Sequence, residues 1–246
     1  LSNNAGSVFT GKGLAYGGSL MRPEATGYGT VYFAQEMLHR AKDGFEGKRV
    51  SISGSGNVAQ YAAVKALELS AKVVTLSDSG GTLVCEAGLT DGQLAELMDW
   101  KNVQRGRLAD FAARHGMLFE SGKRPWHVPA DIALPCATQN ELDEADAKAL
   151  IANGVRCVAE GANMPSTLEA ADAFIHAGVL YAPGKASNAG GVATSGLEMS
   201  QNAMRLSWTH AEVDERLHSI MKDIHHNCVR HGERKDGSVN YVEGAN

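Results

Sequence analysis

The sequence has few cysteines, and they are not grouped. The four cysteines lie far apart and form no Cys-x-x-Cys pair, so their spacing indicates neither a zinc site nor a disulfide framework. They are Cys85, Cys136, Cys157 and Cys228. We therefore expect no metal site, and we expect reduced thiols of the kind found in cytoplasmic proteins.

Long apolar runs and a dominant charge are also lacking. No run approaches the roughly 20 residues that a membrane-spanning helix needs, and the N-terminus lacks the charged-then-apolar pattern of a signal peptide. The net charge is -5, and the lysines and arginines are scattered rather than gathered in one stripe. We therefore expect neither a membrane nor a nucleic acid as a partner.

Both ends of the chain lack the features of a complete protein. The chain begins at Leu1 rather than at a methionine, and its polar tail, "ERKDGSVNYVEGAN", has no evident closing element. The first 21 residues are rich in Gly, Ser and Asn, which favours an irregular lead-in over a packed element. We therefore expect a fragment of a longer protein.

Helical and strand patterns alternate along the rest of the chain. Pro23 and Glu24 indicate the start of a helix over residues 23–42. The apolar spacing then predicts strands at 50–53, 72–77, 131–134, 155–159 and 179–181, and helices at 57–70, 90–101, 108–115, 144–152 and 165–177. A Gly/Asn/Ser-rich loop and two long helices, broken near 207–209, follow. This order is typical of an α/β fold with a Rossmann-like, doubly wound, mostly parallel sheet and flanking helices.

A glycine-rich turn between the first strand and the next helix predicts a dinucleotide site. The string "GSGNVA", residues 54–59, fits the G-x-G-x-x-G/A pattern. Gly54 would allow the tight turn, Gly56 would let the backbone approach a pyrophosphate, and Ala59 would let the helix pack closely on the sheet. Such a string alone can be an ordinary loop turn, but here a strand precedes it and a helix follows it.

An acidic residue at the end of the second strand leaves the choice of cofactor open. Asp78 lies where a carboxylate accepts a hydrogen bond from the ribose 2′-hydroxyl of NAD. Ser77 and Ser79 flank it with hydroxyl donors, and three basic residues, Lys101, Arg105 and Arg107, follow downstream. These cations would suit a 2′-phosphate, although a solvated helix end explains them equally well.

Five longer strings resemble a known family. They are "RPEATGYG" (22–29), "GSGNVAQYA" (54–62), "DIALPCATQNEL" (131–142), "AEGANMP" (159–165) and "NAGGVATSGLEMSQNA" (188–203). Together they resemble the cofactor-binding domain of glutamate dehydrogenases of the hexameric, bacterial, NADP-dependent type, within the glutamate/leucine/phenylalanine/valine dehydrogenases. The resemblance covers nearly the whole chain. It implies one dinucleotide-binding domain over 1–246, with a Rossmann core at about 48–185, the leading helix at 23–42 and C-terminal helices at 192–231.

The resemblance also implies an activity and a missing partner domain. Members of the family interconvert L-glutamate and 2-oxoglutarate plus ammonia, with hydride transfer to or from NADP. Their N-terminal domain supplies the catalytic lysine and aspartate, and it is absent here. We therefore expect no catalytic residue in this chain, which would bind NADP, and NAD less readily, without turnover. The full-length protein is expected to form a homo-hexamer.

The cofactor residues carry over by position. Ser55, Gly56, Asn57 and Val58 would surround the pyrophosphate after Gly54, and Thr26 would contact the nicotinamide carboxamide. Lys101 and Arg107 match 2′-phosphate contacts beside Ser77 and Asp78, whereas Gln104 replaces a third basic residue and weakens the match to NADP. The nicotinamide ribose would lie against Ala137, Thr138, Asn163 and Asn188.

The substrate residues would be Arg22, Val192 and Ser195. A hydroxyl at Ser195 can donate a hydrogen bond to the side-chain carboxylate of glutamate, whereas a dehydrogenase of an aliphatic amino acid should prefer an apolar residue there. Ser195 can also be a small residue that bonds locally in a helix. Two alternatives therefore remain: an aliphatic amino acid as substrate, or a module that senses NAD(P) without being part of an enzyme.

Several other residues suggest chemistry that we do not expect. Cys136 has no assembled base beside it in the sequence pattern and resembles a small buried hydrophobe. His225 and His226 are adjacent on a helix and point about 100° apart, so they favour a solvated face over a metal site. Met199 and Met204 are expected to fill the core.

Overall fold

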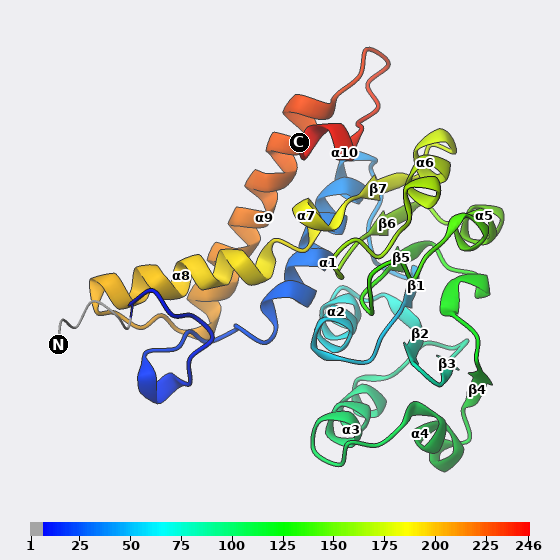
Figure 1. The fold of residues 1–246 in the computed structure, drawn as a ribbon, viewed down its shortest axis with the longest axis horizontal. Helices are drawn as coiled ribbons and strands as arrows, with labels where there is room; N and C mark the ends of the chain where they lie inside the picture. The colour runs from blue at the N-terminus through cyan, green and yellow to red at the C-terminus, as the bar shows by residue number, and fades with distance from the viewer. Residues whose placement is uncertain (1–6) are drawn as a thin grey trace.

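The computed structural model describes residues 7–246 and contains a seven-stranded sheet flanked by helices (Figure 1). The order of the strands is β4-β3-β2-β1-β5-β6-β7. Their bounds are β1 Arg49–Ile52, β2 Lys72–Asp78, β3 Gly81–Val84, β4 Leu118–Ser121, β5 Ile132–Leu134, β6 Cys157–Ala159 and β7 Leu180–Ala182. The prediction of an α/β fold with a mostly parallel sheet is confirmed. Part of the expected irregular lead-in, residues 1–6, lies outside the described residues.

The helices occupy the segments between and after the strands. Their bounds are α1 Ala25–Arg40, α2 Asn57–Glu68, α3 Asp91–Asn102, α4 Leu108–His115, α5 Glu144–Ala152, α6 Leu168–His176, α7 Gly184–Ser187, α8 Gly190–Met204, α9 His210–Gly232 and α10 Tyr241–Gly244. Thr90, Asp143 and Thr209 begin α3, α5 and α9, and each accepts a hydrogen bond from the third helical residue. No helix in the described part of the chain is both long and apolar enough to cross a bilayer.

The parallel part of the sheet has a switch point at β1. This strand pairs in parallel with β2 on one side and with β5 on the other, and β6 and β7 continue the parallel order. In open α/β sheets, ligands bind at such a point, beyond the carboxyl ends of the strands. The sequence pattern does not reveal the other edge, where β2, β3 and β4 are antiparallel, because two four-residue strands give little periodicity.

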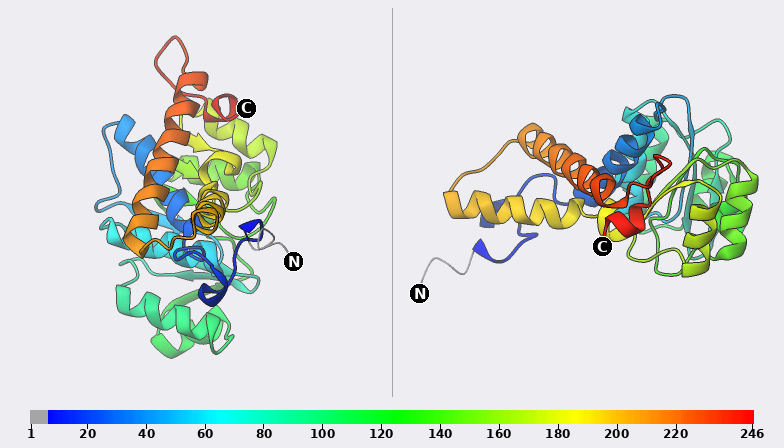
Figure 2. Two further views of the ribbon diagram at one scale, coloured as in Figure 1. Left: turned by 90° about the vertical axis from the view of Figure 1, so that its left-hand side faces the viewer. Right: turned by 90° about the horizontal axis from the view of Figure 1, so that it is seen from above.

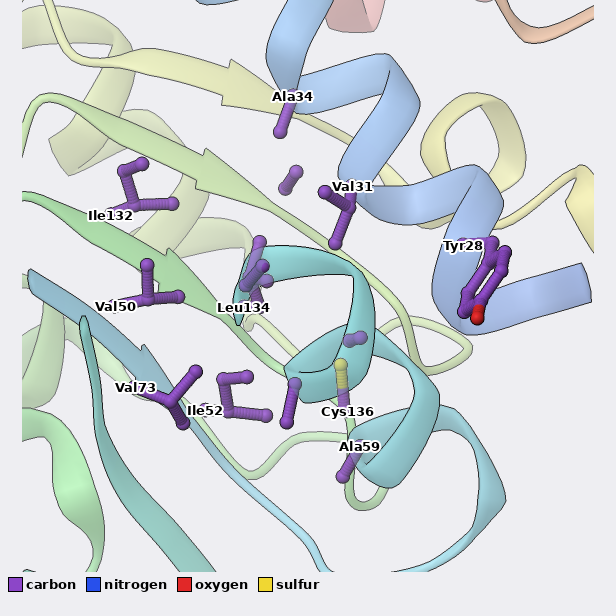
Figure 3. Packing of buried hydrophobic residues seen from close by; sticks show 14 of the residues in the cluster. Tyr28, Val31, Ala34, Val50, Ile52, Ala59, Val73, Ile132, Leu134 and Cys136 are labelled. Carbon is purple, nitrogen blue, oxygen red and sulfur yellow. The ribbon is translucent and has the colours of Figure 1, made fainter. Parts of the chain in front are cut away.

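Alternate residues of β5 and β6 enter two separate apolar clusters. Ile132 and Leu134 pack on the face that carries α1 and α2, whereas Ala133 packs on the face of α5 and α6. Figure 3 shows Val31 and Ala34 of α1 above the strands beside α2. Both faces are therefore covered, which explains why the parallel strands read as continuous apolar runs.

Glycine allows α1 and α2 to approach closely. A Cβ at Gly27 of α1 would lie 2.5 Å from the amide nitrogen of Ala62 and 2.6 Å from the carbonyl oxygen of Val58, both in α2. No side chain larger than hydrogen fits there without moving a helix. This crossing brings the start of α1 beside the turn before α2.

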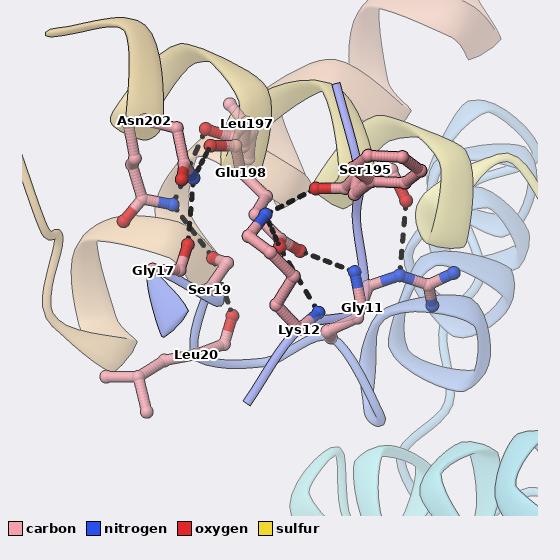
Figure 4. A network of polar contacts seen from close by, with 12 residues as sticks. Gly11, Lys12, Gly17, Ser19, Leu20, Ser195, Leu197, Glu198 and Asn202 are labelled. Carbon is pink, nitrogen blue, oxygen red and sulfur yellow. Dashed lines mark hydrogen bonds and ion pairs between the residues drawn. The ribbon is translucent and has the colours of Figure 1, made fainter. Parts of the chain in front are cut away.

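Helix α8 extends away from the sheet. Helix α9 then runs back toward the sheet and packs against both α8 and α1 (Figures 1 and 2). The described part of the lead-in, residues 7–21, is bound to α8 by part-buried and exposed polar contacts (Figure 4). Glu198 accepts a hydrogen bond from the Gly11 amide at 2.9 Å and pairs with Lys12 Nζ at 2.6 Å. Asn202 donates to the Gly17 carbonyl oxygen at 2.8 Å. The lead-in is therefore irregular, as expected, but anchored.

Several local expectations were wrong. The loop before the last long helices contains α7, and the tail ends in α10, whose Tyr241 is 2% exposed. His225 lies in the core against Phe33 and Tyr241 rather than on a solvated face. Met199 and Met204 are 40% and 52% exposed and do not fill the core. The helices α7 and α10 were missed because four residues show no helical period. The burial of His225 and the exposure of Met199 and Met204 were missed because helix periodicity does not say which neighbours cover a face.

Candidate functional site

A first cavity of about 620 Å³ opens at the carboxyl ends of β1, β2 and β5. Seven of the predicted cofactor residues line it: Gly54, Ser55, Gly56, Ser77, Asp78, Ala137 and Thr138. The opposite wall is the segment 136–141 that follows β5, together with residues 122–125. The cavity therefore lies at the switch point of the sheet, where a dinucleotide is expected in this type of fold.

The glycine turn in this cavity has the geometry that the motif predicts. Gly54 has a φ of +85°, a left-handed conformation that favours glycine, and its amide donates to Ser77 Oγ at 2.8 Å. A Cβ at Gly56 would meet nothing within 4 Å, so the backbone is open to a ligand there. Helix α2 begins at Asn57 without a side-chain cap. Its first amides can therefore donate to an anion, with the positive end of the helix dipole behind them.

The carboxylate of Asp78 is already engaged by the protein. It accepts hydrogen bonds from the amides of Gly80, at 2.8 Å, and Leu108, at 3.1 Å. Lys101 Nζ lies 3.7 Å from it, and the Asp78 side chain is 9% exposed. Arg107 donates to Ser79 Oγ at 2.8 Å. Asp78 thus holds the segment around 101–108 against the end of β2 and brings two cations beside the first cavity.

A second cavity of about 850 Å³ adjoins the first, and the two share residues 136–139 as a common wall. Nine residues of the predicted site line it, although the first and the last of them lie more than 150 positions apart in the sequence. The predicted residues that line it are Arg22, Thr26, Val58, Ala137, Thr138, Asn163, Asn188, Val192 and Ser195. It follows that α1, the loops after β5 and β6, and α8 build one continuous site with the glycine turn.

Two polar pairs organise the second cavity. Arg22 Nε donates to Ser195 Oγ at 3.2 Å, and that hydroxyl lies 3.2 Å from the Gly191 carbonyl oxygen, to which it donates. Asn188 Nδ2 donates to Asn163 Oδ1 at 2.8 Å. Val192, in contrast, is 72% exposed. The cavity therefore combines a guanidinium and a hydroxyl, which can recognise a carboxylate, with amide groups that can bind a carboxamide or ribose.

Three predicted residues do not line either cavity. Asn57 donates its side-chain amide to the Pro23 carbonyl oxygen at 3.3 Å, so it links α2 to the start of α1. Lys101 and Arg107 lie beside the first cavity through their contacts to Asp78 and Ser79. Gln104 donates to Asp99 at 2.9 Å. Its amide is used within its own helix end rather than at the cavity.

Sequence reasoning missed two carboxyl groups: Glu141, a partly buried residue in the wall of the first cavity, and Glu160, which is 3% exposed and adjoins Gly161 in the wall of the second cavity. Glu141 accepts from Ser53 Oγ at 2.7 Å and from the Ala137 amide at 3.0 Å, and burial raises its pKa. Glu160 accepts from Tyr181 Oη at 2.5 Å and from the Gly184 amide at 2.7 Å, and burial raises its pKa as well. Both residues follow strands in strings that the resemblance singled out, so a search for acids after strand ends could have found them.

Cys136 belongs to the wall between the cavities but has no partner that would activate it. Its thiol is buried, and burial raises the pKa far above the usual range. A thiolate is therefore disfavoured, which agrees with a small buried hydrophobe. Among the described residues no group of three or more His, Cys, Asp or Glu side chains could hold a metal ion.

A family model described as glutamate/leucine/phenylalanine/valine dehydrogenase matches residues 17–246. Among curated proteins, the NADP-specific glutamate dehydrogenase of Escherichia coli is 63% identical over 246 residues, which are all of this chain and 55% of that protein. The NAD-specific glutamate dehydrogenase of Bacteroides fragilis is 56% identical over 240 residues, covering 97% of this chain and 54% of the relative. The chain thus spans about half the length of these relatives.

Solved structures agree with the fold. Glutamate dehydrogenase of Plasmodium falciparum superposes with a TM-score of 0.93 at 44% identity, covering 96% of this chain and 51% of that one. The hetero-hexameric glutamate dehydrogenase of Thermus thermophilus gives a TM-score of 0.79 at 26% identity, with 96% and 53% covered. The two cavities therefore occupy a fold that these enzymes share.

Proposed function

The chain belongs to the glutamate/leucine/phenylalanine/valine dehydrogenase family, and we propose that it is the cofactor-binding part of an NADP-dependent glutamate dehydrogenase. The observation that carries the proposal is the continuous site formed by the two cavities. One end offers a glycine turn and free helix amides at Gly54 to Asn57, and the other end offers Arg22 and Ser195. A dinucleotide bound along it would have its phosphates at the turn and its nicotinamide beside the substrate.

The contacts of Asp78 favour NADP over NAD. A carboxylate that selects NAD must be free to accept the 2′-hydroxyl, but this one already accepts from two backbone amides. In the same place Lys101 and Arg107 supply positive charge, which attracts a 2′-phosphate. The names of the relatives alone do not decide this, since NADP-specific and NAD-specific enzymes both match.

The second cavity supports glutamate as the substrate. When bound, the nicotinamide would supply or accept the hydride, and the protein would hold the substrate α-carbon against it. Arg22 supplies positive charge for a carboxylate, and Ser195 Oγ, whose proton goes to the Gly191 carbonyl oxygen in the free protein, can turn that proton toward a carboxylate instead. An aliphatic side chain would leave the guanidinium charge of Arg22 without a counter-charge in the cavity. Thr26, Asn163 and Asn188 line the same cavity and would bind the carboxamide and ribose.

We further propose that the rest of a longer protein closes this site and supplies the catalytic lysine and aspartate. Large apolar side chains remain exposed on the lead-in and α8: Val8, Phe9, Leu14, Tyr16, Val192, Met199 and Met204. Val8, Val192 and Met199 line the second cavity. Exposed apolar side chains that gather at a cavity are typical of an interface. The whole chain would act as one dinucleotide-binding domain of a hexameric, cytoplasmic enzyme, as the reduced cysteines and the hexameric Thermus relative suggest.

Calorimetric titration of the chain with NADP⁺ and NAD⁺ tests the proposal. We expect tighter binding of NADP⁺, and replacing both Lys101 and Arg107 by alanine should reduce that preference by about 100-fold or more, because each of the two charged hydrogen bonds contributes about 1.5–3 kcal/mol. Lys148→Ala, an exposed lysine on α5, is the matched control for loss of one positive charge. Tighter binding of NAD⁺ would refute the cofactor assignment, and binding of neither would refute the function.

A further inference from the structure

The wall of the first cavity contains an acid where an anionic ligand would bind. Glu141 lines the same cavity as Gly54, Ser55 and Gly56, the turn that is open to phosphate groups. Most phosphate-binding cavities present donors and cations to their ligand. A carboxylate in this wall therefore needs a physical explanation.

Local contacts explain what Glu141 does in the free protein. Its Oε1 accepts from Ser53 Oγ and from the Ala137 amide, and the Thr138 amide also donates to the carboxyl group. Ser53 Oγ in turn accepts from the Cys136 amide at 2.8 Å. The carboxyl group thus ties the end of β1 to the segment that separates the two cavities.

The charged groups around Glu141 do little to keep it ionised. Arg124 lies nearest, but its guanidinium donates to the Glu141 backbone oxygen and is paired with Asp143 and Asp146, at 3.1 and 2.5 Å. Lys123, in the same cavity wall, is paired with Glu120 at 2.7 Å. Asp78 and the buried Cys136 are the other titratable groups of the wall, and neither brings positive charge.

Burial already raises the pKa of Glu141 in the free protein, against the effect of its hydrogen bonds. A dinucleotide in the cavity would remove further water and bring its own negative phosphates close to the carboxylate. Both changes disfavour the charged form. The nearby cations are engaged elsewhere, so the simplest compensation is a proton taken from solvent.

We propose that Glu141 takes up a proton when a dinucleotide binds in the first cavity, so that cofactor affinity is coupled to pH through this one side chain. The inference rests on the proposed cofactor site. It predicts that the dissociation constant rises with pH, by up to about tenfold for each unit by which binding raises the pKa of Glu141. It also predicts uptake of up to one proton per ligand.

The test is calorimetric titration of the chain in two buffers that differ in ionisation enthalpy, at several values between about pH 5 and pH 8. The difference in heat between the buffers measures the protons taken up. NAD⁺ is the first ligand, because the 2′-phosphate of NADP⁺ would itself titrate near pH 6. With NADP⁺, the difference between the unsubstituted chain and Glu141→Gln isolates the proton of Glu141.

Glu141→Gln keeps an oxygen acceptor for Ser53 and Ala137 but cannot titrate, and Glu169→Gln, an exposed acid on α6, is the control. We expect proton uptake in the unsubstituted chain and in Glu169→Gln. In Glu141→Gln, the part of the proton uptake that comes from position 141 should be lost. Binding without proton uptake, or equal uptake in Glu141→Gln, would overturn the coupling while leaving the cofactor site intact. Failure of both dinucleotides to bind would overturn the site itself and the coupling with it.

Discussion

The buried histidine of α9 should make the stability of the protein depend on pH. His225 is 7% exposed and lies between Phe33, with ring centroids 5.4 Å apart, and Tyr241, whose hydroxyl is 3.0 Å from Nε2. Burial, with smaller effects of Arg40 and His226, lowers the pKa of His225 to about 4 from 6.5. A charged imidazolium is therefore excluded from this contact between α1, α9 and α10.

The sign and size of the effect follow from linkage. Because the folded pKa is the lower one, the unfolded chain binds the proton first as the pH falls, and stability is lost from about pH 6.5 down to about pH 4. For these two pKa values, the free energy of unfolding should fall by about 2 kcal/mol between pH 8 and pH 5. Above about pH 7 the contribution is complete and constant.

Urea unfolding followed by circular dichroism measures this loss. His225→Gln keeps a polar group for the Tyr241 hydroxyl but cannot titrate in this range. Between pH 8 and pH 5, its free energy of unfolding should therefore fall by about 2 kcal/mol less than that of the unsubstituted chain. His226→Gln, the same substitution at the exposed neighbouring residue, should behave like the unsubstituted chain. An equal pH dependence in all three proteins would show that His225 is not neutral in the folded state.

Two further changes test the packing and the substrate assignment. Gly27→Ala should lower the free energy of unfolding by about 1–3 kcal/mol, since the new methyl group would collide with the backbone of α2. Gly196→Ala on α8, where a Cβ would meet nothing within 4 Å, should instead raise the free energy of unfolding by about 0.5–1 kcal/mol. Equal effects of the two substitutions in urea unfolding would contradict the close crossing of α1 and α2. In the full-length protein, Ser195→Val should reduce kcat/KM for glutamate by about 10- to 100-fold relative to an aliphatic amino acid, and an unchanged ratio would remove Ser195 from the substrate site.

The order of the elements could be predicted because each one is encoded locally. The helix start at Thr209 and the helix α5 follow from capping residues and apolar spacing within a few positions. The antiparallel strands β3 and β4 were not predicted, because they are short and form only through pairing between β2, β3 and β4. The same limit hid the burial of His225, which depends on α1 and α10.

The sequence by itself determined the local geometry of the glycine turn at which we propose that a dinucleotide binds. The left-handed turn at Gly54 and the uncapped start of α2 depend on residues that adjoin in the chain. Only the tertiary structure decided what the neighbouring acids do. Asp78 accepts hydrogen bonds from backbone amides 2 and 30 residues away, and Glu141 accepts from Ser53 Oγ, 88 residues away. The physical reason is that backbone conformation depends mainly on local preference, whereas the orientation and charge of a buried carboxyl group depend on which distant donors and cations the fold brings to it.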